Sequence, residues 1–213
     1  MKTKGFVDIS GKNWIFFPKF ALENCINAEF VDMKQKSQVI FERNTVEFVT
    51  VAAEYCAFIE RSEGMKRAEF VDTMLKVLPL LYIKASMLPE CEVMGEDGLE
   101  AFVTEEDYEV IRINLQEVMA DRDDYLDVFV EDMKYSDTPI RKSVAEDLAD
   151  VYQAVKDFVC QFQSGLNETM HDALATVRER FAEYWGQTVV NTMRALHEVK
   201  FGANDDEEEE YDD

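Results

Sequence analysis

Glycine and proline are scarce in this chain. Eight glycines and four prolines among 213 residues suit long helices with short connections. Apolar residues, by contrast, make up 47% of the chain, and aromatic residues are plentiful. That content argues against wholesale disorder, and the length is enough for one domain with a real core.

Cysteine and histidine are also few. The four cysteines lie far apart, with no C-x-x-C pair and no framework typical of small secreted proteins. We therefore interpret them as reduced thiols of a cytosolic protein. His171 and His197 have no second histidine or cysteine at metal-ligand spacing, which argues against zinc. The sequence also contains no glycine-rich phosphate loop, nucleophile elbow or dinucleotide fingerprint.

A long hydrophobic run is missing. No stretch approaches the roughly 18 apolar residues of a membrane span. The segment "WIFFPKFAL" is too short for a signal peptide, and Pro18 and Lys19 interrupt it. The sequence predicts a cytoplasmic location and no membrane contact.

Positive charge is in short supply. Lysine and arginine total 22 against 45 aspartates and glutamates, so the formal net charge is −23. Nucleic acids repel such a chain, because their phosphates are normally bound by clustered lysine and arginine. We therefore expect no direct nucleic-acid binding. The acid-rich residues 203–213 are expected to form a disordered tail.

Residues 1–36 form a poorly patterned extension. Met33 precedes the first clear helical pattern. One interpretation is therefore that Met33 is the true start of translation. The other is an ordered arm that docks Trp14, Phe16, Phe17 and Phe20 on the rest of the protein. The sequence leaves both interpretations open. Residues 37–202 are predicted to be the folded domain.

Apolar residues in that domain recur with the period of a helix, and nowhere do they sustain the alternation of a strand. We therefore predict an all-α, single-domain bundle of about five to six helices, mostly antiparallel to their neighbours. The Trp185 side chain is expected in the core. The helices expected from the pattern cover residues 39–63, 66–87, 104–133, 143–162 and 167–201.

Several residues indicate where these helices begin or break. Thr104 is followed by acids, which suits the start of the third helix. Asp137 or Thr138 is the expected cap of the fourth helix, and Asn167 that of the fifth. Pro79 cannot donate a backbone hydrogen bond, so it predicts a kink or a break in the second helix.

Three segments resemble a known family. "LPLLYIKASMLP", "SVAEDLADVYQAVKDF" and "EYWGQTVVNTMRALHEV" occur in the same order as in the bacterial helical family catalogued as domain of unknown function 5063. The resemblance spans residues 38 to 201. It implies an all-helical cytoplasmic protein with no assigned activity, and it supplies no catalytic residue.

The segment from residue 104 to 133 carries the strongest hint of chemistry. On a continuous helix its acids lie opposite the apolar stripe of Ile111, Leu115 and Val118, as on any solvated helix face. We favour that interpretation. The alternative is a Mg²⁺ site, because Glu105, Glu106 and Glu109 spell an E-E-x-x-E pattern similar to that of the all-α nucleotide pyrophosphohydrolases.

The metal alternative has a geometric difficulty. Glu109 and Asp124 would lie about 22 Å apart on one helix, too far to share an ion. A second set becomes possible if the third and fourth helices form a hairpin that turns near Ser136. Its members are Asp123, Asp124, Asp127, Asp147 and Asp150. No phosphate-binding lysine or arginine accompanies them in sequence, so we assign no metal and no cofactor.

Arg122 interrupts the apolar stripe of the predicted third helix. A guanidinium on a core-facing side must be paired or must reach the edge. The hairpin register places Asp150 first and Asp147 second as partners, which predicts a structural ion pair between the two helices. An arginine lining an anion-binding cleft and an edge position without a role are the alternatives.

No catalytic residue emerges from these patterns. The sequence therefore favours a non-catalytic protein-interaction module with an unidentified protein partner. One alternative is a Mg²⁺-dependent, pyrophosphohydrolase-like enzyme that uses the carboxylates of the third and fourth helices. The other is an acidic mimic of nucleic acid that occupies a basic partner.

Overall fold

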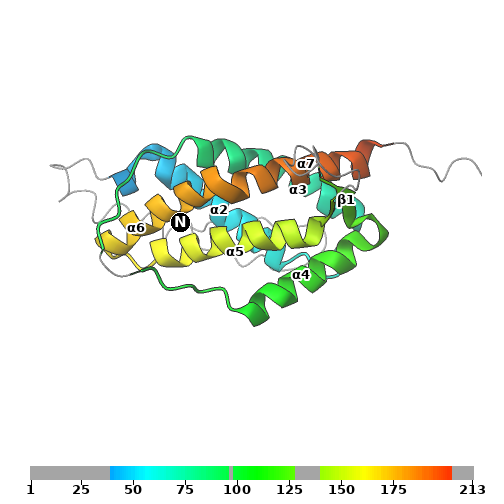
Figure 1. Ribbon diagram of the computed structural model, residues 1–213, viewed down its shortest axis with the longest axis horizontal. Coiled ribbons are helices and arrows are strands. Elements are labelled where there is room, and N and C mark those ends of the chain that lie inside the picture. The colour runs from blue at the N-terminus through cyan, green and yellow to red at the C-terminus, as the bar shows by residue number, and fades with distance from the viewer. Residues whose placement is uncertain (1–38, 96–97, 128–139, 203–213) are drawn as a thin grey trace, which may run out of the picture. The chain divides into compact units, whose positions relative to one another are not determined.

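The computed structural model describes residues 39–95, 98–127 and 140–202, all of which belong to one compact unit that begins at Val39. The predictions for residues 1–36 and for the tail 203–213 lie outside these ranges. The predicted all-α fold class is confirmed (Figure 1). The α-helices are α2 (Arg43–Glu60), α3 (Arg67–Ser86), α4 (Glu105–Met119), α5 (Val144–Phe162), α6 (Asn167–Arg180) and α7 (Gly186–Phe201).

Shorter elements connect these helices. They are the 3₁₀ turns η1 (Val39–Phe41) and η2 (Ala120–Arg122), the π-helical turn η4 (Phe181–Trp185), and the strands β1 (Asp124–Leu126) and β2 (Arg141–Ser143). The two strands pair antiparallel and form the only sheet among the described residues. No helix in the described ranges has the length and apolar character needed to cross a membrane.

Helix α5 lies at the centre of the packing and contacts α2, α4, α6 and α7. Its predicted apolar stripe is buried, from Val144 to Phe158. The predicted place of Trp185 in the core is confirmed, since its ring is fully buried between Phe48 and Phe181. The indole nitrogen donates to the carbonyl of Val177 at 3.1 Å, so burial leaves no unsatisfied donor there.

Two predicted boundaries differ from the structure. Helix α3 continues across Pro79, so a break at that proline was a wrong prediction. The buried Leu78 and Leu81 hold both halves of the helix on the core, which offsets the missing hydrogen bond. Helix α5 begins after Ser143, whose hydroxyl accepts from the Glu146 amide at 3.1 Å, rather than after Asp137 or Thr138.

The predicted third helix ends early. Its start is confirmed, with a reciprocal cap between Thr104 and Asp107, but α4 stops at Met119 instead of residue 133. Ala120 takes a backbone conformation with φ of 50° and ψ of −121°, which an α-helix does not accommodate. The chain leaves the helix there, because the backbone beyond it forms β1 and pairs with β2.

The predicted fifth helix is one continuous helical path. It contains the π-helical turn η4 (Phe181–Trp185), which we call the wide turn. Helix α6, η4 and α7 follow one another without a gap from Asn167 to Phe201. Asn167 is the first helical residue, and the residue before it, Leu166, makes no side-chain cap. At the wide turn the amide of Gly186 bonds to the carbonyl of Phe181.

The described core predicts that residues 33–202 fold without their flanks. Every buried side chain named above lies between Val39 and Gly202. A chain from Met33 to Gly202 should therefore melt cooperatively, within a few degrees of the full-length protein, in thermal unfolding followed by circular dichroism. A loss of ten degrees or more would show that the flanks add substantial stability.

Candidate functional site

The structure distributes the acids of the metal alternative over several elements. Asp123 follows η2, and Asp127 follows β1. Asp124 lies in β1, and Asp147 and Asp150 lie on α5. The Asp123 carboxylate accepts from the Ala145 amide and the Ser143 hydroxyl, at 2.8 and 2.7 Å, so it fixes the start of α5. Asp124 pairs with Arg141 across the two-stranded sheet.

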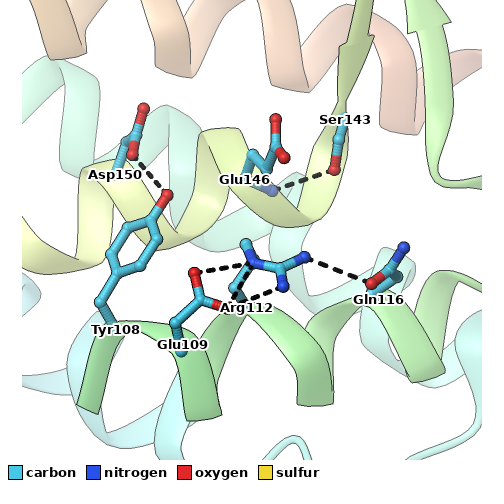
Figure 2. Close-up of polar contacts among 7 residues, drawn as sticks. All are labelled: Tyr108, Glu109, Arg112, Gln116, Ser143, Glu146 and Asp150. Atoms are coloured by element: carbon cyan, nitrogen blue, oxygen red, sulfur yellow. Dashed lines mark hydrogen bonds and ion pairs between the residues drawn. The ribbon is translucent and has the colours of Figure 1, made fainter. Parts of the chain in front are cut away.

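Asp150 is bound by two tyrosines instead of by arginine. Tyr108 of α4 donates its hydroxyl to one carboxylate oxygen of Asp150 at 2.8 Å (Figure 2), and Tyr184 donates to the other. Burial, and then the hydrogen bond to Asp150, raise the pKa of Tyr108, so its hydroxyl stays protonated and remains a donor. The contact joins α4, α5 and the wide turn before α7.

Asp147 is similarly engaged. Its carboxylate accepts from the Tyr125 hydroxyl of β1 and from the Thr192 hydroxyl of α7, the latter at 3.4 Å. Burial raises the pKa of Asp147, although the bond from Tyr125 works in the opposite direction. Within the described ranges no three histidine, cysteine or carboxylate side chains come together as a metal site would require.

Arg122 does not lie where the sequence placed it. It belongs to η2, after α4 has ended, so the helical register that assigned it to Asp150 or Asp147 does not exist. Its ion pair within the described residues is with the neighbouring Asp121, at 3.7 Å, and its side chain is 42% exposed. The predicted structural ion pair of Arg122 with Asp150 or Asp147 was therefore wrong.

The acidic side of α4 is a solvated face, as favoured from the sequence. Glu105, Glu106 and Glu117 are exposed. Glu109 pairs with Arg112 at 2.8 Å, and that arginine also donates to Gln116 on the same helix, at 3.3 Å (Figure 2). The charges of Glu109 and Arg112 are therefore satisfied locally.

A concave site lies elsewhere, under the connection between α3 and α4. We call the described part of this connection, residues 88–95 and 98–103, the strap; it passes the adjoining ends of α5 and α6 (Figure 1). Asp157 of α5 is buried and accepts from the amides of Phe102 and Val103, at 2.7 and 2.8 Å. Gln161, one turn later, donates to the Glu100 carbonyl at 2.8 Å.

A third buried side chain holds the other half of the strap. Asp172 of α6 accepts from the amides of Met94 and Gly95, at 2.6 and 3.0 Å. A Cβ atom on Gly95 would lie 2.5 Å from the Asp172 carboxylate, so only glycine permits this approach. The strap is thus attached to the bundle partly by its backbone, and the side chains of Met94 and Phe102 remain exposed.

The strap and the two helices enclose a cavity of about 770 Å³, which we call the strap groove. Large apolar side chains on its walls are exposed: Met94 by 55%, Phe102 by 46% and Leu166 by 64%. The described residues on its walls are Met94, Gly98, Leu99, Glu100, Phe102, Gln161, Ser164, Leu166, Asn167, Glu168, Thr169 and Asp172.

Sequence reasoning missed this site. It left residues 88–103 as the connection between two predicted helices, and it singled out none of the three side chains that hold this segment. Asp157 and Asp172 lie on the polar sides of their predicted helices, where acids are ordinarily solvated. No local signal distinguishes them, because their partners are distant in sequence. The Phe102 amide is 55 residues from Asp157, and the amides bound by Asp172 are 77 and 78 residues from it.

A second group of exposed apolar side chains lies on α3 and at its C-terminal cap, Met87. Leu80, Ile83 and Met87 are 51%, 49% and 45% exposed, and their spacing places them on one side of the helix, opposite its buried residues. None of the three lines a cavity described here. They provide matched controls for substitutions in the strap groove.

Comparison with known proteins extends these observations. The family described as Domain of unknown function (DUF5063) matches residues 39–202, which confirms the resemblance inferred from the sequence. The crystal structure of protein BF1032 from Bacteroides fragilis is similar, with 57% sequence identity and a TM-score of 0.72. That match covers 79% of this chain and 99% of the other. No curated protein matches the chain.

Proposed function

The chain belongs to the DUF5063 family, whose description assigns no activity, and we propose its function from the geometry alone: a non-catalytic protein-interaction module. The strap groove receives an apolar segment of a partner protein. The observation that carries this proposal is the concave cavity lined by Met94, Phe102 and Leu166, all about half exposed or more.

The openness of these walls favours a protein segment over a small molecule. Ligand pockets for small molecules typically bury about 70–90% of the ligand's surface. Leu166 and Met94 project into water from two different walls of the groove, one from the α5–α6 connection and one from the strap. Exposed apolar side chains gathered in one concave site are characteristic of surfaces that bind other proteins.

The buried acids also support a binding role. Asp123, Asp147, Asp157 and Asp172 each accept hydrogen bonds from amides or hydroxyls of the chain itself. Such contacts fix helices and loops in place, so these four carboxylates act as structural acceptors. The acid on the groove wall, Asp172, already uses both of its oxygens on the strap.

The proposal includes a cytoplasmic location and a partner that is a protein rather than a nucleic acid. The described cysteines, Cys56, Cys91 and Cys160, are free thiols. Free thiols are usual in a reducing compartment. The excess of acids over bases disfavours phosphate backbones as ligands.

Two probe peptides test the docking surface on the full-length protein. One is a decapeptide in which lysine alternates with leucine and phenylalanine, and the other has glutamine in place of each lysine. We expect L166S and F102S each to weaken binding of both peptides about fivefold, because each removes roughly 1 kcal/mol of apolar contact. Fluorescence anisotropy of the labelled peptides gives the dissociation constants.

The matched controls are L80S and I83S, which remove side chains of similar exposure outside the groove. They should leave both dissociation constants unchanged. Equal losses for groove and control variants would contradict the proposal, and so would unchanged binding by L166S and F102S. Melting temperatures within a few degrees of the parent protein confirm that each variant is folded.

A further inference from the structure

We infer that the strap groove selects a positively charged segment, in which lysine or arginine stands next to apolar residues. This inference rests on the proposed function and specifies the partner's chemistry. The groove is lined by three acidic residues, Glu100, Glu168 and Asp172, and, among the described residues, by no lysine, arginine or histidine. Arg180 lines a separate cavity of about 50 Å³ beneath the strap.

The two exposed acids of the groove differ from those surface acids that form ion pairs. In the described part of the chain no base forms an ion pair with Glu100 or Glu168, although both are exposed. Glu47, Glu109 and Asp121, in contrast, each pair with an arginine at 2.5 to 2.8 Å. The groove therefore presents negative charge that the described bases do not neutralise.

The acids lie on two walls. Glu168 is on α6, one helical turn before Asp172, and its carboxylate approaches the strap at Gly95, 2.9 Å from the position of a Cβ atom there. Glu100 belongs to the strap, where the bond from Gln161 to its carbonyl fixes the backbone. Acidic residues therefore stand on both walls of the groove, with exposed apolar side chains beside them.

The N-terminus of α6 also lies on the groove, and its dipole favours an anion. Leu166 provides no side-chain cap, so amides of the first turn are open to a ligand. The dipole is equivalent to about half a positive charge, however, and Glu168 already occupies that first turn. The carboxylates of Glu168 and Glu100 outweigh it, even with Asp172 partly neutralised by its two amides. The net preference is for a cation.

The aromatic wall adds to this preference. Phe102 is 46% exposed and lines the same cavity as Glu100 and Glu168. A lysine or arginine side chain lying over an aromatic face gains a further attraction, and its methylene groups pack on apolar surface. An acidic segment gains neither contact. The groove chemistry thus distinguishes partner segments by charge as well as by shape.

The experiment compares the same two decapeptides, the lysine form and its glutamine form, in fluorescence anisotropy with the full-length protein. We expect the lysine form to bind about tenfold more tightly at low salt, and the difference to shrink as salt is added. E100Q combined with E168Q should reduce the affinity for the lysine form about tenfold. The same pair of substitutions should change the affinity for the glutamine form less than twofold.

Because the whole protein is acidic, any cationic peptide is attracted to it. The matched control is E106Q combined with E117Q, which makes the same change in net charge on the exposed side of α4. It should leave affinity for the lysine form within twofold of the parent. Equal losses from both double variants would overturn the charge selection, as would tighter binding of the glutamine form. In either outcome, loss of binding in L166S still tests the docking surface separately.

Discussion

Replacing Asp157 by alanine is expected to lower the free energy of unfolding by about 3 kcal/mol or more. The carboxylate is buried, and a single oxygen accepts from the amides of both Phe102 and Val103. Alanine cannot accept either bond, so two donors lose their partner, one of them buried. The cost of leaving such donors unpaired exceeds the net value of the hydrogen bonds themselves.

Urea denaturation of the full-length protein measures this loss. D157N keeps an oxygen at the accepting position and should cost about 1 kcal/mol, because it loses only the charge on the acceptor. E117A, on the exposed side of α4, should change stability by less than about 0.5 kcal/mol. A D157A loss no larger than the E117A change would mean that the strap is not held by this carboxylate.

Replacing Gly186 by alanine is expected to destabilise the protein by about 2 kcal/mol. The backbone at Gly186 is ordinary helix, with φ of −64° and ψ of −44°. On propensity alone, alanine would therefore stabilise by about 1 kcal/mol. A Cβ atom there would lie 2.5 Å from the Phe181 carbonyl oxygen and 2.9 Å from its ring, however. The backbone of the wide turn would have to shift, and the ring contact between Phe181 and Trp185 would shift with it.

The matched substitution is Gly98→Ala in the strap. A Cβ atom at Gly98 would meet nothing within 4 Å, so alanine should be neutral or should stabilise by up to about 1 kcal/mol. Thermal and urea unfolding of both variants give the two signs. A stabilising Gly186→Ala would show that the wide turn converts to a regular helix without penalty.

Hydrophobic periodicity predicted much of the fold but misplaced one helix end. The stripe of Ile111, Leu115 and Val118 continues in sequence with Leu126, so the pattern extended the third helix past Met119. No glycine or proline marks the true end at Ala120. The determinant is a long-range one, the pairing of β1 with β2, and periodicity within a segment cannot report it.

The candidate site was beyond sequence reasoning for a related physical reason. An aspartate on the polar side of a helix has the same local pattern whether it faces water or the amides of a distant loop. Asp157 and Asp172 became recognisable only when the strap was in place against them. The predictions for Asp124 and Arg122 followed from a helical register that ends before either residue.

The two-stranded sheet has a consequence for engineering the chain. Leu126 of β1 pairs with Arg141 of β2, and the Asp127 amide donates to the Ile140 carbonyl at 2.8 Å, which extends the strand ladder by one bond. The two ends of the intervening segment are therefore held together by the bundle whatever joins them. Lengthening a tethered loop costs only about 0.6 kcal/mol for each doubling, because loop-closure entropy grows with the logarithm of length. An insertion between Asp127 and Ile140 is accordingly expected to leave the strap groove undisturbed.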